Sequence, residues 1–139
     1  MRSERFLDTN ILIYAALGRR DDRPKYEVAK QIIADGKIGL SAQVLAEFYV
    51  GVTKKPATSL ALAETDRWMD VLRRFPVVSV DETLVRSAIV LARRFQIHYY
   101  DAAIIAAAER LGAPILYTED LNHGQLYGSV QVQNPFRDP

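Results

Sequence analysis

Cysteine is absent from this 139-residue chain, and histidine occurs only twice. The first absence excludes disulfide bonds, zinc–thiolate sites and thiol nucleophiles, and the scarcity of histidine argues against a histidine-rich metal site. The sequence also lacks an apolar run of about 18 residues, the length that predicts a membrane-spanning helix. No secretory hydrophobic segment precedes its first strand pattern. We therefore expect a cytoplasmic protein with no membrane association.

Neither sign of charge predominates, because 18 Lys and Arg residues are balanced by 17 Asp and Glu residues, for a net charge of +1. The overall charge therefore gives no indication of nucleic-acid binding. Basic residues nevertheless occur in short clusters, at Arg19–Arg20, Arg23–Lys25, Lys54–Lys55, Arg73–Arg74 and Arg93–Arg94. These clusters would form a nucleic-acid surface if the acids gather elsewhere. Alternatively they are solvated helix ends, where cations interact favourably with the helix dipole.

Strand and helix patterns alternate along the chain. Strands are predicted over residues 4–8, 38–40, 77–80, 113–118 and 130–132. Helices are predicted over residues 11–17, 24–35, 42–53, 60–75, 82–95 and 101–111, with a polar loop over residues 54–59. With 49% hydrophobic residues and no internal repeat or linker, residues 1–139 are expected to form a single α/β domain. The alternation favours a mostly parallel sheet covered by helices on both faces.

Four carboxylates fall at strand ends or in helices. Asp8 and Asp120 follow predicted strands, Glu47 lies in a helical stretch, and Asp101 opens an alanine-rich helix. In parallel α/β sheets, ligands bind outside the carboxyl ends of the strands. Carboxylates gathered there would supply the oxygen ligands that Mg²⁺ or Mn²⁺ prefers.

Asp101 has the most informative position of the four, because it lies on the apolar face of its helix with Ile104, Ile105 and Ala108. An ionised carboxylate at the edge of a core is costly unless it is paired, caps a helix or binds a metal. Helix capping is the alternative to a functional role, and the two can coexist.

The other acids have ordinary alternatives too. Asp8 also suits the N-cap of the helix that follows it. Glu47 borders an apolar arc beside Gly51, where a small residue leaves room for a ligand, but a border glutamate is often simply solvated. Asp120 and its neighbour Glu119 would look the same in a plain polar loop.

Polar and aromatic residues near these acids also have two interpretations. Asn10 and Thr118 would orient the acids or a metal-bound water, unless they serve turns and caps. His98 and His123 are expected to be satisfied loop histidines rather than acid–base groups, since neither has an orienting carboxylate nearby in sequence. The pair Tyr99–Tyr100 would stack on bases, or else form a half-buried pair before a helix.

Four segments of the chain are characteristic in their order and spacing: Phe6–Leu12, Leu40–Phe48, Tyr100–Ala108 and Tyr117–Leu121. In these segments, and in a tail that ends in Asn134-Pro135-Phe136, the sequence resembles the PIN-domain ribonucleases. The resemblance is greatest to the VapC toxins of bacterial and archaeal toxin–antitoxin pairs, and it covers nearly the whole chain.

The resemblance implies a flavodoxin-like three-layer α/β/α sandwich and a Mg²⁺- or Mn²⁺-dependent endoribonuclease. It carries over four catalytic and metal-binding acids with two supporting polar residues, namely Asp8, Glu47, Asp101, Asp120, Asn10 and Thr118. Of the two adjacent acids, Asp120 rather than Glu119 matches the family position. A metal-activated water would hydrolyse RNA, with tRNA and rRNA as candidate substrates, to leave 5′-phosphate and 3′-hydroxyl ends. Asp101 or Glu47 would act as general base.

The resemblance also implies partners, a homodimer and a cognate antitoxin that inserts a basic side chain into the acidic pocket. Two other functions stay open. An aspartyl-phosphate phosphotransferase is the nearest enzymatic alternative, but Asn10 stands where haloacid-dehalogenase-like enzymes need a second acid, and Asp8 lacks the acidic neighbour of two-component receivers. The other is a non-catalytic scaffold that binds RNA or protein through the apolar segments 11–17, 44–52 and 60–75.

Overall fold

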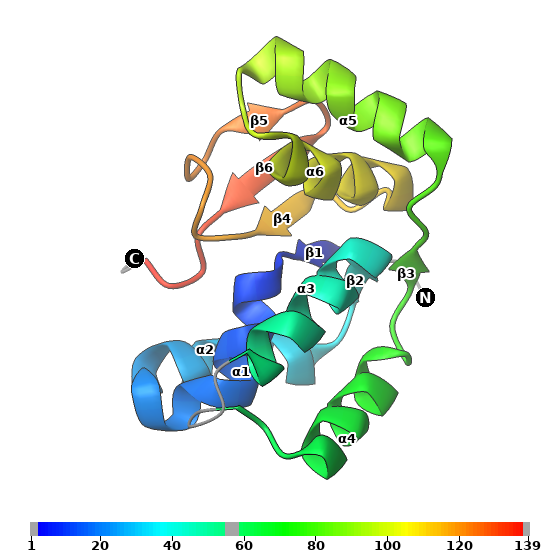
Figure 1. Ribbon diagram of the computed structural model, residues 1–139. Coiled ribbons are helices and arrows are strands. Elements are labelled where there is room, and N and C mark those ends of the chain that lie inside the picture. The colour runs from blue at the N-terminus through cyan, green and yellow to red at the C-terminus, as the bar shows by residue number, and fades with distance from the viewer. Residues whose placement is uncertain (1–2, 55–58, 138–139) are drawn as a thin grey trace.

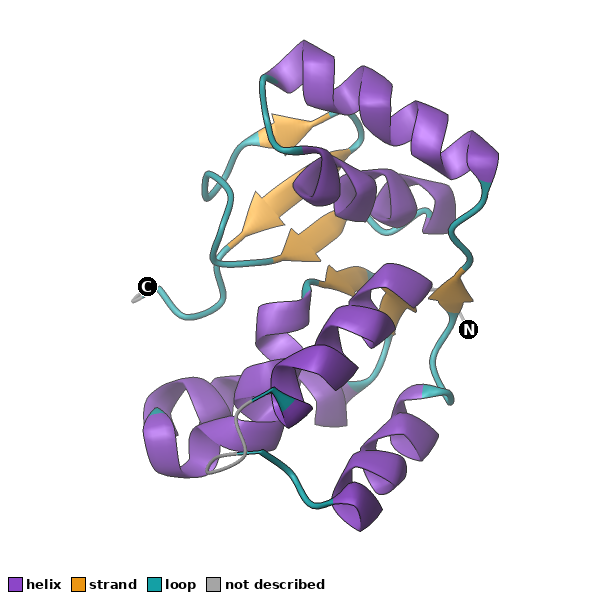
Figure 2. Cartoon of the chain, in the orientation of Figure 1, coloured by secondary structure: helices purple, strands orange, loops and turns teal. Residues whose placement is uncertain are grey.

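The computed structural model describes residues 3–54 and 59–137, which form six strands and six helices (Figure 1, Figure 2). The strands are β1 (Arg5–Leu7), β2 (Ile38–Ser41), β3 (Val77–Val78), β4 (Ile115–Tyr117), β5 (Leu126–Tyr127) and β6 (Val130–Gln133). The helices are α1 (Thr9–Asp21), α2 (Arg23–Asp35), α3 (Ala42–Thr53), α4 (Leu62–Leu72), α5 (Glu82–Phe95) and α6 (Tyr99–Leu111). Most of the predicted loop over residues 54–59, and Lys55 with it, lies outside the described residues.

All six strands belong to one sheet, in the order β3-β2-β1-β4-β6-β5. Every neighbouring pair is parallel except β5 and β6, so the prediction of a mostly parallel sheet is confirmed. From β1 the chain builds outward through β2 to β3, then returns to place β4 on the other side of β1. The order of the strands therefore reverses between β1 and β4, and ligands of open α/β sheets bind at such a switch point.

Helices pack on both sides of this sheet. Figure 1 shows α5 and α6 paired on one side and α1, α2 and α3 grouped on the other, with α4 packed against α3. The alanine-rich α6 contacts β2, β3, β4 and β6, and every residue from Ala102 to Ala108 is buried. Small side chains let this helix approach the sheet closely, which fixes where its N-terminus lies.

The first helix is longer than the sequence predicts. It was expected to stop before Gly18, but α1 continues to Asp21. A side chain at Gly18 would lie 3.1 Å from the Cβ atom of Tyr26, so this glycine permits the close packing of α1 against α2 rather than ending a helix. The short strand β5 was also not predicted, because its residues read as part of a polar loop.

Three of the basic clusters lie at helix ends. Arg19 and Arg20 are in the last turn of α1, Arg93 and Arg94 are in the last turn of α5, and Arg73 is the C-cap of α4. Cations at these positions interact favourably with the helix dipole. The helix-end interpretation therefore accounts for these clusters without a nucleic-acid ligand.

None of the helices in the described part of the chain combines the length and the hydrophobicity that a bilayer-spanning segment needs.

Candidate active site

Asp8 lies where β1 ends beside β4. The strands are paired with Leu7 opposite Tyr117, and the backbone N–H of Asp8 donates to the Tyr117 carbonyl at 3.0 Å. One residue further on, the Thr118 hydroxyl donates to Oδ2 of Asp8 at 2.7 Å. Asp8 is only 6% exposed and Thr118 is fully buried. Parallel pairing thus joins the ends of two strands that are far apart in sequence.

Asp8 is also the N-cap of α1, since its Oδ1 accepts a hydrogen bond from the Thr9 backbone N–H at 2.6 Å. The capping interpretation is therefore confirmed, and it does not exclude another role. Both oxygens of this buried carboxylate are engaged within the fold.

Asp120 is tied to the same strand ends. Its backbone N–H donates to the Thr118 hydroxyl oxygen at 3.1 Å, and its Oδ2 accepts from Nδ2 of Asn10 at 3.1 Å. Thr118 therefore bridges Asp8 and Asp120, and Asn10 holds Asp120 from α1. The remaining amide oxygen of Asn10 is buried, and no described residue donates a hydrogen bond to it.

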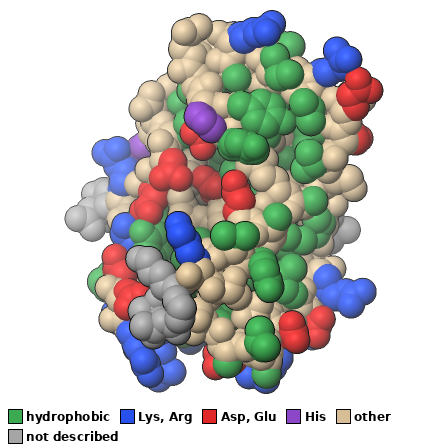
Figure 3. Space-filling view, viewed as in Figure 1, with side chains coloured by type: hydrophobic (Ala, Val, Ile, Leu, Met, Phe, Trp, Pro, Cys, Tyr) green, Lys and Arg blue, Asp and Glu red, His purple; other side chains and the backbone are tan. Residues whose placement is uncertain are grey.

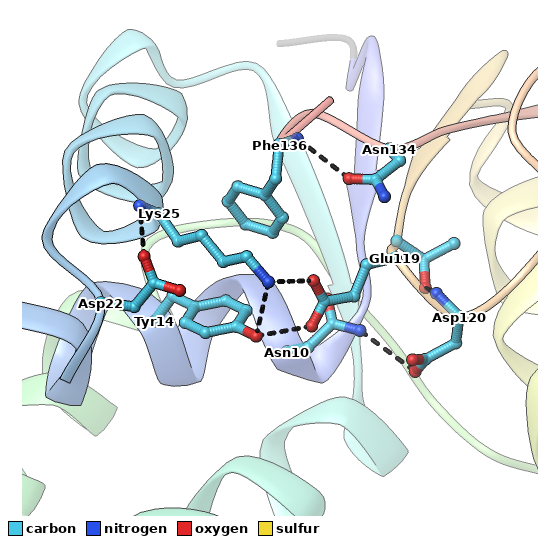
Figure 4. A network of polar contacts seen from close by, with 9 residues as sticks. Asn10, Tyr14, Asp22, Lys25, Glu119, Asp120, Asn134 and Phe136 are labelled. Carbon is cyan, nitrogen blue, oxygen red and sulfur yellow. Dashed lines mark hydrogen bonds and ion pairs between the residues drawn. The ribbon is translucent and has the colours of Figure 1, made fainter. Parts of the chain in front are cut away.

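Glu119 lies in a different environment from its neighbour Asp120 (Figure 4). Its Oε2 pairs with Nζ of Lys25 at 2.9 Å, and its Oε1 accepts from the Tyr14 hydroxyl at 2.6 Å. The ring of Phe136 packs edge-on against Tyr14, and the Lys25 ammonium lies over both rings. We call Tyr14, Lys25, Glu119 and Phe136 the Glu119 cluster. Hydrogen bonds from the Lys25 ammonium to Glu119 and Tyr14 raise the pKa of Lys25, so Lys25 stays charged in its ion pair with Glu119.

Glu47 extends from α3 toward α1. Its Oε1 accepts from the Thr9 hydroxyl at 2.7 Å, and its Oε2 accepts from Nε2 of Gln43 at 3.4 Å. Neighbouring Gly51 does not simply leave room for a ligand, because a Cβ atom there would lie 2.6 Å from Cδ1 of Ile13. Gly51 thus also permits the packing of α1 against α3, which brings Glu47 to Thr9.

Asp101 reaches the site from the first turn of α6. The N-cap of this helix is His98, whose Nδ1 accepts from the Tyr100 backbone N–H at 3.3 Å, so the capping interpretation of Asp101 is wrong. Asp101 is half-buried, and no described residue donates a hydrogen bond to its side chain. The buried helix behind it holds Asp101 in place.

The carboxylates interact through their charges. Burial, together with the charges of Asp120 and Asp101, raises the pKa of Asp8 to about 6 despite the hydrogen bonds from Thr118 and Thr9. Burial also raises the pKa of Asp101, with added repulsion from Asp120 and Glu47 that His98 partly opposes. Asp8, Glu47, Asp101 and Asp120 therefore share one electrostatic site, and Figure 3 shows acidic side chains gathered in a hollow of the surface.

These residues have the chemistry of a hard-cation site, with negative oxygens at close quarters and an unpartnered buried amide oxygen on Asn10. Within the described residues, however, no three Asp, Glu or His side chains are arranged as ligands of a single ion. The described part of the chain thus contains no ready-made carboxylate cage. Mg²⁺ commonly takes one or two carboxylates and keeps several waters, so a set of three protein carboxylates is not required to bind it.

Some participants were not singled out from the sequence. Tyr14 is four residues after Asn10, so both lie on one face of α1, and that spacing was a usable signal. Lys25 gave no local signal, because its partner Glu119 is 94 residues away. His123 accepts a hydrogen bond from the Asn134 backbone N–H at 2.9 Å, so it is the satisfied loop histidine that was predicted.

Similar folds occur among toxins of toxin–antitoxin systems. A chain of a toxin–antitoxin complex from Klebsiella pneumoniae matches with a TM-score of 0.70 at 22% identity, over 94% of this chain and 97% of that one. A chain of VapBC2 from Rickettsia felis, bound to a DNA fragment from its promoter, matches with a TM-score of 0.65 at 21% identity, over 94% and 97%. VapC20 from Mycobacterium tuberculosis, a Sarcin-Ricin loop cleaving toxin, matches with a TM-score of 0.66 at 19% identity, over 84% and 89%.

At these identities the likeness shows a shared fold. No curated protein sequence matches the chain. The sequence profile of the PIN domain matches residues 5–128, which is most of its length. The chain belongs to the PIN domain family.

Proposed function

We propose that this protein is a Mg²⁺- or Mn²⁺-dependent endoribonuclease that acts as the toxin of a toxin–antitoxin pair. The observation that carries this proposal is the meeting of four acids from distant segments at the switch point between β1 and β4, where two of them have raised pKa values. Membership of the PIN domain family and the fold shared with VapC toxins support the same function.

Asp8, Glu47, Asp101 and Asp120 would hold the divalent cation. When bound, the cation would lower the pKa of a water and offset the charge that develops on the phosphate. Thr118 and Asn10 keep Asp8 and Asp120 oriented, since they hydrogen-bond to these two carboxylates. Asp101 has no hydrogen-bond donor among the described residues, so an oxygen that does not contact the cation would be free to accept a proton from the attacking water.

The geometry favours this hydrolysis over an aspartyl-phosphate intermediate. A phosphotransferase would need an Asp8 oxygen free to attack phosphorus. Oδ1 of Asp8 is held by the Thr9 N–H and Oδ2 by the Thr118 hydroxyl, and the residue is 6% exposed. Asp8 is therefore poorly placed to act as a nucleophile.

The proposed partners are an antitoxin protein and a second copy of the chain, with RNA as substrate and the cytoplasm as the place of action. Exposed apolar side chains beside Glu47 support a protein contact, because Tyr49 is 49% exposed and Val50 is 58% exposed. A small protein that co-purifies with this one and suppresses RNA cleavage would distinguish an inhibited enzyme from an inert scaffold.

RNA cleavage with Mg²⁺ or Mn²⁺ tests the proposed activity, by comparing the wild type with Asp8→Asn and Asp101→Asn. Each substitution keeps the size of the side chain and removes its charge, and we expect the cleavage rate to fall at least about a hundredfold. Asp70→Asn is the matched control, because Asp70 is exposed on α4 away from the site. Cleavage that survives both site substitutions, or that survives EDTA, would exclude this mechanism.

A further inference from the structure

The N-terminus of α6 carries three consecutive ring side chains, His98, Tyr99 and Tyr100. The His98 and Tyr100 rings are stacked, with centroids 5.7 Å apart and planes 27° from parallel. The Tyr99 and Tyr100 rings meet edge to face at 5.1 Å. Tyr100 nevertheless remains 57% exposed. Its neighbours therefore hold its orientation while more than half of its surface stays open to solvent.

The Tyr100 ring is not packed against the core of the described residues. The sequence left open whether Tyr99–Tyr100 is a half-buried pair or a base-stacking pair. Tyr99 is half-buried and packs against the core, whereas Tyr100 is exposed and makes its ring contacts only with its two chain neighbours among the described residues. An exposed, pre-oriented aromatic ring is suited to contact a planar ligand at small cost in side-chain entropy.

Tyr100 adjoins the acidic site directly. The next residue is Asp101, and the Tyr100 carbonyl accepts a hydrogen bond at 3.2 Å from Nε2 of Gln43, which also donates to Glu47. Gln43 thus ties the start of α6 to α3, with Asp101 next to Tyr100 in the chain and Glu47 on the same glutamine. Figure 3 shows hydrophobic side chains beside the acidic hollow.

We propose that Tyr100, backed by His98, stacks on an unpaired base of the RNA substrate next to the phosphate that the acids address. This assignment rests on the proposed ribonuclease function and adds a residue that contacts the substrate. Stacking accepts every base because all bases have a π face. Bases inside a duplex do not reach such a ring, whereas those of loops and single strands do.

The charges around the site oppose RNA binding, and a stacking contact would offset this. The four acids repel the phosphate backbone, and the basic clusters at the ends of α1, α4 and α5 are accounted for by helix dipoles. With a net charge of only +1, long-range attraction to RNA is weak. An uncharged stacking contact beside the acids supplies affinity that their charge opposes.

The test measures RNA binding without cleavage, in an Asp8→Asn background with Mg²⁺. The two probes are a fluorescent single-stranded RNA decamer and a decamer of abasic tetrahydrofuran nucleotides with the same phosphate backbone. We expect Tyr100→Ala to weaken binding of the RNA decamer about tenfold and to leave binding of the abasic decamer unchanged. Tyr100→Phe keeps the ring and should bind like the parent, as should Val90→Ala, which trims an exposed apolar side chain on α5.

Equal affinity of Tyr100→Ala and its parent for the RNA decamer would overturn the assignment, and so would an equal loss on both probes. A change in the oligomeric state of Tyr100→Ala with no base-dependent loss would also overturn it, by assigning the ring to a protein contact. Because binding is measured without turnover, the two proposals fail separately. A wild type that binds bases through Tyr100 but does not cut RNA would leave the stacking site standing and reject the ribonuclease.

Discussion

Asp8 shows how one residue serves the fold and the site together. Its carboxylate caps α1 and accepts the Thr118 hydroxyl, and both contacts favour the charged form. Burial and the nearby charges of Asp120 and Asp101 oppose that form and outweigh the hydrogen bonds, so the pKa rises to about 6. Burial and mutual repulsion make the ionised forms of these carboxylates unfavourable. A bound cation would stabilise those ionised forms.

We predict that the raised pKa of Asp8 makes the free energy of unfolding depend on pH. The folded-state pKa of Asp8 is about 6, above its ordinary value of 3.8, so the native state binds the proton more tightly than the unfolded state. Stability should therefore fall as the pH rises from 4 to 7, by up to about 3 kcal/mol from this group alone. Asp8→Asn, which still caps the helix, should remove that part of the slope in urea unfolding with EDTA.

The control for this measurement is Asp70→Asn, an exposed position whose substitution should leave the wild-type slope unchanged. The same pH dependence in wild type and Asp8→Asn would contradict the assigned pKa.

Residue-level prediction from the sequence succeeded where the signal was local. The placement of Asp101 on an apolar helix face correctly put it at a core edge, although it is the third residue of α6 and His98 is the cap. The different surroundings of Glu119 and Asp120 were not predictable, because they depend on Lys25 and Asn10, which are far away in sequence.

Among the elements, the segment after β4 depends most on long-range contacts. The Glu119 cluster joins this segment to α1, α2 and the C-terminal Asn134–Phe136 stretch. Since Glu119 is held on one side and Asp120 is bonded to Asn10 on the other, the cluster fixes the direction of the backbone between them. We therefore regard Lys25 as a positioning residue for Asp120.

Lys25→Met keeps the apolar stem of the side chain and removes its charge. We expect it to lower the free energy of unfolding by about 1–2 kcal/mol, because Glu119 loses its charged partner. It should also lower kcat for RNA cleavage, because Asp120 is held less firmly. The rate is measured well below the unfolding temperature, where the variant is folded. Lys25→Arg should restore much of both.

Arg23→Met is the matched control on the same helix. Its ion pair with Glu27 is more than half exposed at both ends and should contribute less than about 0.5 kcal/mol. If Lys25→Met is as stable and as active as Arg23→Met, the Glu119 cluster does not position Asp120.

Helix positions were largely predictable because their signals are periodic and local, as in the buried face of α6. The ends of helices and strands that depend on tertiary packing were not predictable. The length of α1 depends on Gly18 against Tyr26, and the pairing of β5 with β6 depends on a hairpin in a polar stretch. Alternating strands and helices predicted a parallel sheet, but the order of its strands follows from contacts between distant segments.

On the scale of the whole molecule, the site is a consequence of topology. The sheet places β1 beside β4 at the reversal of strand order. Two helices from opposite sides of the sheet, α3 and α6, reach the same edge. Acids from four segments thereby share one field, although no three of them among the described residues form a finished ligand set. The central claim is that these acids bind one divalent cation jointly.

Calorimetric titration of Mn²⁺ into the metal-free protein measures that claim directly, for the wild type, Asp8→Asn, Asp101→Asn and Asp70→Asn. We predict one site per chain in the wild type, an affinity at least about tenfold weaker in each of the two site variants, and an unchanged affinity in Asp70→Asn. Equal affinities in all four proteins, or a wild type that binds no Mn²⁺, would contradict it.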